Sequence, residues 1–163
     1  MGQGMMIVAF VIALGLLTMY FADVQDTQRN PNQSPMSAAL GNAVEVALLR
    51  NRQGHYFVSG AINRQPAEFL LDTGATDVVI PEDLAAQLQL RPGLPAQAMT
   101  ANGVITVYST TIDILSIGDI ELRNVRASIN PSMRGQSILL GMSALKQIEF
   151  VQQGERLTLR QVY

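Results

Sequence analysis

The sequence predicts an all-β domain, a barrel-like assembly of short strands, preceded by one apolar N-terminal helix. From about residue 44 onward, short runs of aliphatic and β-branched residues alternate with turns rich in Gly, Asn and Pro. Such spacing is typical of sandwiches and barrels. Only two short segments of this region have helical character, and the first 22 residues carry no charged side chain. These observations predict two parts of the chain, an apolar N-terminal segment of the kind that spans membranes and a compact β domain.

The N-terminal segment is predicted to span a membrane. Met5–Phe21 is uncharged, and about 20 apolar residues at ~1.5 Å each cross a hydrocarbon layer of ~30 Å. A cleaved signal peptide is the alternative, but the basic residues that such peptides carry before the apolar run are lacking. A signal-like segment also sends the following chain across the membrane. We therefore expect residues 1–22 to anchor the protein in the inner (cell) membrane, with the body outside the cytoplasm, in the periplasm.

Residues 23–39 are predicted to be a flexible linker, and residues 40–163 to be the folded domain. The linker is polar, contains two prolines and has no apolar periodicity. Two short helices are expected over residues 81–88 and 143–146. Strands are expected over residues 44–49, 55–62, 67–71, 78–80, 97–100, 104–114 and 138–140. Two more strands are expected in residues 117–129, around Gly118-Asp119, and residues 149–163 are expected to form a hairpin that turns at Gln153-Gly154.

Composition leaves carboxylates as the main candidates for catalysis. The chain has no Cys, which removes disulfides, thiolate catalysis and Cys-based metal sites. Its single histidine, His55, rules out a multi-histidine metal site, and no glycine-rich phosphate loop is present. A net charge of -2 gives no basic field for nucleic acid. We therefore expect no metal, no cofactor and no nucleic-acid partner.

The most informative segment is an apolar strand that ends in Asp72-Thr73-Gly74. A strand of this kind places the acid at the mouth of a turn; the Thr73 hydroxyl can lock the turn, and Gly74 allows close backbone approach. Two carboxyls ~3 Å apart share one proton. The ionised one can then take a proton from water while the other polarises a peptide carbonyl. The alternative is an ordinary turn, since all three residue types favour turns.

The sequence contains this tripeptide once, so a second acid would have to come from a second copy of the chain. Residues 69–76, Phe-Leu-Leu-Asp-Thr-Gly-Ala-Thr, are followed later by Ile-Leu-Leu-Gly-Met at residues 138–142. Together these motifs resemble the retropepsin-like aspartic proteases, most closely the single-domain, membrane-anchored bacterial members. The resemblance covers about residues 44–163. It implies a closed β-barrel that forms a homodimer and hydrolyses extended polypeptide without a cofactor.

The resemblance also implies a role for each matching residue. Asp72 would be catalytic and would form a dyad with its counterpart, while Thr73 would bond across the dimer axis. The hairpin turn at residues 101–103, an Asn-Gly turn signal, lies where the family carries a flap that closes over substrate. Leu140-Gly141 would pack behind the catalytic loop. The substrate-binding positions would be Gly74, Ala75, Thr76, Ala101, Asn102 and Gly103.

Two positions depart from the viral members, which carry an Asp and an Arg that form a salt bridge between subunits. Here those places hold Thr76 and Met142. Two membrane anchors could compensate, because confinement to a surface raises the effective concentration of one subunit near another. The neighbouring Asp77 is open to two interpretations, a substrate contact or a turn cap.

A second hypothesis is that the domain has the same barrel fold but no catalytic activity. The domain would then be a non-catalytic module that binds a partner polypeptide by adding a strand to an exposed sheet edge.

Overall fold

The structure is a computed structural model that describes residues 2–100 and 103–163. It is mostly β, and the strands fall close to the predicted ones, with β1 added. The elements in chain order are α1 (Gly2–Arg29), β1 (Ser37–Leu40), β2 (Ala43–Leu49), β3 (Phe57–Ile62), β4 (Gln65–Leu71), β5 (Val78–Pro81), α2 (Glu82–Gln87), β6 (Pro95–Thr100), β7 (Gly103–Ile117), β8 (Ile120–Asn130), β9 (Ser137–Leu140), α3 (Met142–Leu145), β10 (Glu149–Gln153) and β11 (Arg156–Val162).

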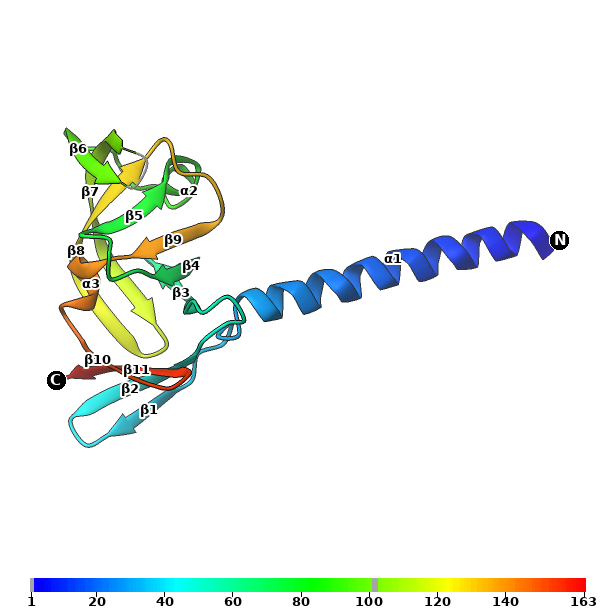
Figure 1. Ribbon diagram of the computed structural model, residues 1–163, viewed down its shortest axis with the longest axis horizontal. Helices are drawn as coiled ribbons and strands as arrows, with labels where there is room; N and C mark the ends of the chain where they lie inside the picture. The colour runs from blue at the N-terminus through cyan, green and yellow to red at the C-terminus, as the bar shows by residue number, and fades with distance from the viewer. Residues whose placement is uncertain (1, 101–102) are drawn as a thin grey trace.

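Two sheets form the body, and α1 projects away from both (Figure 1). The larger sheet has seven strands in the order β3-β4-β9-β5-β8-β7-β6. It curls so that β3 also pairs with β7, through Ala61 with Ser116 and Ile62 with Leu115. The smaller sheet has the order β1-β2-β11-β10. The predicted all-β, barrel-like class is confirmed.

Parallel pairing of β4 with β9 brings two distant segments of the chain side by side within the larger sheet. Their register runs from Glu68 opposite Ser137 to Leu71 opposite Leu140, so both strands end side by side. Phe69 on β4 is fully buried in the core, and burying such a side chain contributes ~1.5–3 kcal/mol. The core therefore fixes the strand that leads directly into Asp72.

The helix α1 is longer than the predicted membrane segment, because it continues without a break to Arg29. The stretch Gly4–Arg29 has a mean hydropathy of 2.4 in its most apolar window and none of that window is buried. This helix is long and apolar enough to cross a membrane. A signal sequence near the N-terminus would meet the same criteria of length and composition.

The residues expected to form a flexible linker are largely built into the structure. Asn30 and Asn32 are buried, and β1, which pairs with β2, also begins inside the expected linker. The Asn32 side chain accepts a hydrogen bond from Leu49 N at 2.7 Å and donates to Leu49 O at 2.9 Å and to Phe57 O at 2.7 Å. The polar side chains in this segment form hydrogen bonds with backbone groups of the body and do not face water. Composition alone therefore wrongly predicted a solvated, flexible linker.

The end of α1 is fastened to the body by a small polar cluster, which we call the anchor junction: Arg29, Asn30, Asn51, Glu68 and Ser137. The Glu68 carboxylate pairs with Arg29 and accepts hydrogen bonds from Asn30 Nδ2 at 3.2 Å and Ser137 Oγ at 2.7 Å. Asn51 Nδ2 donates to Arg29 O at 2.9 Å. The anchor junction thus joins α1 to both β4 and β9.

Candidate active site

Asp72 begins a tight loop at the end of β4. Its backbone N–H donates to Leu140 O at 3.2 Å, and its carbonyl accepts from Ala75 N at 3.2 Å. One carboxylate oxygen, Oδ1, accepts the Gly74 N–H at 2.9 Å. In the part of the chain that the structure describes, Oδ2 makes no hydrogen bond. The side chain is half-buried, so one oxygen is held by the loop and the other is left for water or a partner.

A second segment clamps this loop from behind. At the start of α3, Met142 N donates to Ala75 O at 2.8 Å and Ser143 N donates to Thr76 O at 2.9 Å. Gly141 lies so close that a Cβ there would stand 2.1 Å from Asp77 O and 2.7 Å from Ala75 O. Gly141 therefore packs behind the Asp72 loop, as the resemblance implied, and only glycine fits the space.

Ser143 is a further residue of this clamp, and the sequence analysis did not single it out. It is buried, accepts a hydrogen bond from Val78 N at 3.0 Å and donates to Arg126 O at 2.6 Å. A serine near the start of a short helix looks like an ordinary surface residue in sequence. Its role depends on contacts with β5 and β8, which sequence spacing does not reveal.

Ser143→Ala is expected to lower the free energy of unfolding by ~1–3 kcal/mol, because it leaves the buried Val78 N–H without this hydrogen-bond partner and removes the bond to Arg126 O. Chemical denaturation of the two proteins measures this difference. Ser34→Ala, at an exposed position, is the matched control and should change stability by less than ~0.5 kcal/mol. Equal effects at the two positions would contradict the proposed clamp.

A cleft of about 720 Å³ opens beside Asp72. The predicted substrate-binding residues Gly74, Ala75 and Thr76 line it together with Asp72. Residues 96–100 of β6 also line it, including Met99, which is 88% exposed. The sequence analysis predicted substrate-binding residues at the tip of the β6–β7 hairpin and none in strand β6. An Asn-Gly turn is a stronger sequence signal than an exposed strand.

The hairpin tip can be described only in part. β6 and β7 pair antiparallel up to Thr100 opposite Gly103, as the turn signal predicted. Ala101 and Asn102 lie outside the described residues. Gly103 begins β7 with a positive φ of 110°, a conformation that favours glycine, and it is not among the residues that line the cleft.

Asp77 is paired with an arginine of the same chain. Its Oδ1 lies 2.7 Å from Arg126 Nε, and both residues line the cleft. The Arg126 side chain is 64% exposed, so solvent screening leaves such a pair worth ~1 kcal/mol or less. The places of the viral ion pair, Thr76 and Met142, contribute backbone hydrogen bonds to the loop clamp instead.

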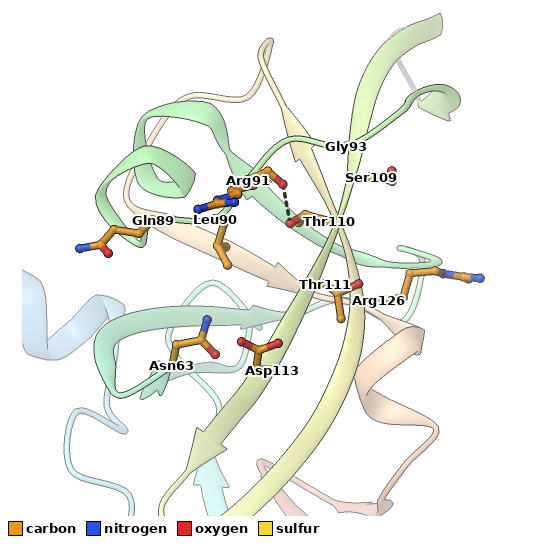
Figure 2. Close-up of a pocket in the computed structure, with 10 residues that line it drawn as sticks. All are labelled: Asn63, Gln89, Leu90, Arg91, Gly93, Ser109, Thr110, Thr111, Asp113 and Arg126. Carbon is orange, nitrogen blue, oxygen red and sulfur yellow. Dashed lines mark hydrogen bonds between the residues drawn. The ribbon is translucent and has the colours of Figure 1, made fainter.

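A second cavity, of about 670 Å³, shares Ser109 and Arg126 with the cleft and is lined mainly by residues of β7 and the 89–93 loop. Figure 2 shows Arg126 directed away from Arg91 and Asp113, while Thr110 Oγ1 donates to Arg91 O at 2.9 Å. None of the predicted site residues lines this cavity. The candidate site is therefore the cleft at Asp72.

Thr73 faces a third, smaller cavity of about 300 Å³, which it shares with Asp72, Tyr56 and Phe150. Thr73 is exposed, and its hydroxyl makes no hydrogen bond within the described residues. Asp72 therefore lies between two hollows, one walled by the hairpin arm and one beside β10.

Comparison with known proteins identifies the family. A family model described as "gag-polyprotein putative aspartyl protease" matches residues 58–147, more than half of the chain. The chain belongs to this aspartyl protease family. The matched range of this retropepsin-like chain includes both the Asp72 loop and the Gly141 clamp. The predicted family and fold are confirmed.

The retropepsin-like chain is also similar to a solved structure, a retropepsin-like aspartic protease from Rickettsia conorii. The two share 25% identity with a TM-score of 0.63, over 78% of this chain and 96% of that one. Among curated sequences, it is 30% identical over 111 residues to an uncharacterized protein from the cobV 5' region of a Sinorhizobium species. It is 26% identical over 108 residues to an uncharacterized protein of Rickettsia prowazekii. These matches cover 66% and 64% of this chain but 48% and 46% of the relatives, so the chain spans about half their length.

Proposed function

We propose that this retropepsin-like chain is a membrane-anchored aspartic endopeptidase that acts as a homodimer. The observation that carries the proposal is the placement of Asp72. Its carboxylate is held by Gly74 N–H through one oxygen, on a loop clamped by Gly141, at the mouth of the 720 Å³ cleft. A cleft of this size suits a peptide segment. The chain contains one Asp-Thr-Gly, so the second carboxylate comes from a second copy.

The reaction follows from two carboxyls that share one proton. The ionised Asp72 takes a proton from a water molecule held between the pair, and that water oxygen attacks the peptide carbonyl carbon. The protonated Asp72 of the other copy donates its proton to the carbonyl oxygen, which gives a neutral tetrahedral intermediate. The first Asp72 then donates the proton that it took from water to the peptide nitrogen, while the other Asp72 takes a proton from a hydroxyl of the intermediate. The C–N bond breaks, a carboxylic acid and an amine leave, and the pair again holds one proton. The β6–β7 hairpin encloses the substrate, with Gly74, Ala75 and Thr76 along its backbone.

We propose that α1 is retained as the anchor, with the body on the periplasmic side of the inner membrane. The helix continues past its apolar stretch into residues that bind the body through the anchor junction. Strands β4 and β9 run from that junction to Asp72 and Gly141. In Figure 1, α3 accordingly lies on the side of the body away from α1, so the candidate site faces away from the bilayer.

The direct test is hydrolysis of an unfolded polypeptide by the full chain in detergent micelles. We expect fragments with new amino termini, formed fastest at mildly acidic pH, because the pair must hold one proton and loses it as the pH rises. Cleavage should persist in a metal chelator, since carboxylates alone activate the water. Mass spectrometry of the products from about pH 4 to about pH 8 measures the profile. Intact substrate at every pH would contradict the proposal.

A second candidate function is binding of a partner polypeptide without hydrolysis. It is favoured by the free edges of the two sheets, since β6 and β10 each end a sheet and consist mostly of exposed residues. Extended peptides add to such edges through backbone hydrogen bonds. Binding of an unfolded polypeptide with no fragments formed, and with no change in Asp72→Asn, would support this function instead.

A further inference from the structure

We propose that Arg126 selects polypeptide substrates that carry an acidic side chain near the cleaved bond. This selectivity depends on the proposed function, because it names the class of polypeptide that the cleft at Asp72 takes. Of the described residues that line this cleft, Arg126 is the one with a cationic side chain, the acids are Asp72 and Asp77, and the others are uncharged. An acidic side chain in the cleft would therefore find its counter-charge at Arg126.

The charged end of Arg126 lies on the side of the cleft. Figure 2 shows its side chain directed away from Arg91 and Asp113, which line the neighbouring cavity. Its Nε lies 2.7 Å from Asp77 Oδ1, and Asp77 lines the cleft but not that cavity. The guanidinium is therefore available to a substrate bound beside Asp72.

The ion pair with Asp77 uses only one nitrogen of Arg126. It is made through Nε, and the two terminal nitrogens make no hydrogen bond within the described residues. The side chain of Arg126 is 64% exposed, whereas that of Asp77 is 27% exposed. Two parallel N–H groups of a guanidinium match the two oxygens of a carboxylate. An acidic side chain of the substrate can therefore bind the terminal nitrogens while Asp77 keeps Nε.

Arg126 is held in place before a substrate arrives. Its carbonyl accepts a hydrogen bond from Ser143 Oγ at 2.6 Å, and it lies opposite Thr111 in the pairing of β8 with β7. Asp77 fixes the side chain through Nε. A long side chain that is already ordered loses less conformational entropy on binding than a free one. Asp77 is therefore a positioning residue for Arg126, and Arg126 is the group that contacts the substrate.

A basic side chain of the substrate is disfavoured at the same place. It would approach Asp77 only beside the guanidinium of Arg126, and like charges at close range repel each other. The cleft should therefore favour acidic over neutral and neutral over basic side chains. The proposed homodimer carries two copies of Arg126 related by a two-fold axis, so the preference should appear on both sides of the cleaved bond.

Synthetic peptides of one apolar sequence, with Glu, Gln or Lys placed in turn at each position around a central bond, test this selection. The full chain in micelles is assayed at about pH 6, where a Glu side chain is ionised. At one position on each side of the bond, kcat/KM should be about fivefold higher for Glu than for Gln, as for an exposed ion pair, and lowest for Lys. Equal kcat/KM for Glu and Gln at every position overturns the proposal.

Two variants separate a substrate contact from a structural role of the ion pair. Arg126→Gln should remove the preference for Glu, and the uncovered Asp77 carboxylate should then make Lys the better side chain. Asp77→Asn should keep or increase the preference for Glu, because the Asn oxygen can still accept from Arg126 Nε and no carboxylate repels the substrate. Loss of the preference in both variants would indicate that the pair only supports the cleft, and would overturn the proposal.

The matched control is Arg91→Gln. Arg91 is an exposed arginine that lines the neighbouring cavity and not the cleft, so its replacement removes the same charge from the protein. The ratio of kcat/KM for Glu to that for Gln should stay within about twofold of the unmodified chain. A loss equal to that of Arg126→Gln would indicate an effect of net charge, with no contact at Arg126.

Equilibrium binding of the same peptides, followed by fluorescence anisotropy, keeps this test distinct from that of the proposed function. A chain that cleaves the peptides without regard to their charge retains the function and loses this selection. A chain that cleaves none, but binds the Glu peptides about fivefold more tightly than the Gln peptides, retains the selection and loses the function. Absence of both cleavage and charge-dependent binding removes both.

Discussion

Asp72→Asn is expected to abolish peptide-bond cleavage and leave the fold intact. The amide cannot take a proton from water, so at least ~10³-fold of the rate should be lost. The Asn side-chain oxygen can still accept the Gly74 N–H that Oδ1 accepts at 2.9 Å, so the loop keeps its hydrogen bond. Product formation from an unfolded polypeptide and thermal unfolding measure the two effects separately.

The matched control for this substitution is Asp113→Asn. Asp113 is an exposed carboxylate that lines the cavity of Figure 2, and Asp72 is not part of that lining. Its replacement should leave the cleavage rate within about twofold, since surface substitutions rarely exceed ~0.5 kcal/mol. Full activity in Asp72→Asn would exclude the proposed chemistry, whatever the control does.

Gly141→Ala is expected to remove activity through the loop, without touching the carboxylate. The backbone of Gly141 has φ −87° and ψ −175°, angles that alanine adopts freely, so conformational preference is not the reason. The added Cβ would stand 2.1 Å from Asp77 O and 2.7 Å from Ala75 O, and both are backbone atoms that cannot rotate away. We expect a loss of more than ~3 kcal/mol of unfolding free energy.

Denaturant unfolding and cleavage rate together measure the effect of Gly141→Ala. Gly15→Ala is a suitable control, because a Cβ at Gly15 in α1 meets nothing within 4 Å. If Gly141→Ala kept the stability and activity of the control, the close packing behind the loop would not exist.

Much of the site was predictable because two short motifs encode it. The Asp72 turn and the Gly141 element each consist of consecutive residues whose types match their positions: an acid after a buried strand, and a glycine where no Cβ fits. Parallel pairing of β4 with β9 joins the two motifs, whereas the family resemblance implied only that Leu140-Gly141 packs behind the catalytic loop. The strands were predictable for a similar reason, since apolar alternation and turn residues are local signals.

The parts that sequence missed depend on contacts between distant residues. Ser143 bridges β5 and β8, and Arg126 meets Asp77 across the cleft wall. The linker prediction failed for the same reason. Asn30 and Asn32 are residues of a type that is common in loops. Their side chains nevertheless form hydrogen bonds with the body, and both residues are buried. No periodicity marks a polar residue that is buried by its hydrogen bonds.

On the proposed anchoring of α1 in a membrane, the anchor junction would also limit how the body moves. The 28 residues of α1 measure ~42 Å, more than the ~30 Å hydrocarbon layer. In the proposed arrangement the polar end of the helix would therefore extend beyond the lipid. A body fixed to this helix would not tumble freely and would diffuse in the plane of the membrane and rotate about its normal. Neighbouring copies would then lie at the same distance from the membrane and with the same tilt relative to it. Two anchored copies would then need to match only their positions in the membrane plane and their rotation about its normal in order to associate. A weaker contact between the copies would therefore suffice for a dimer than in solution.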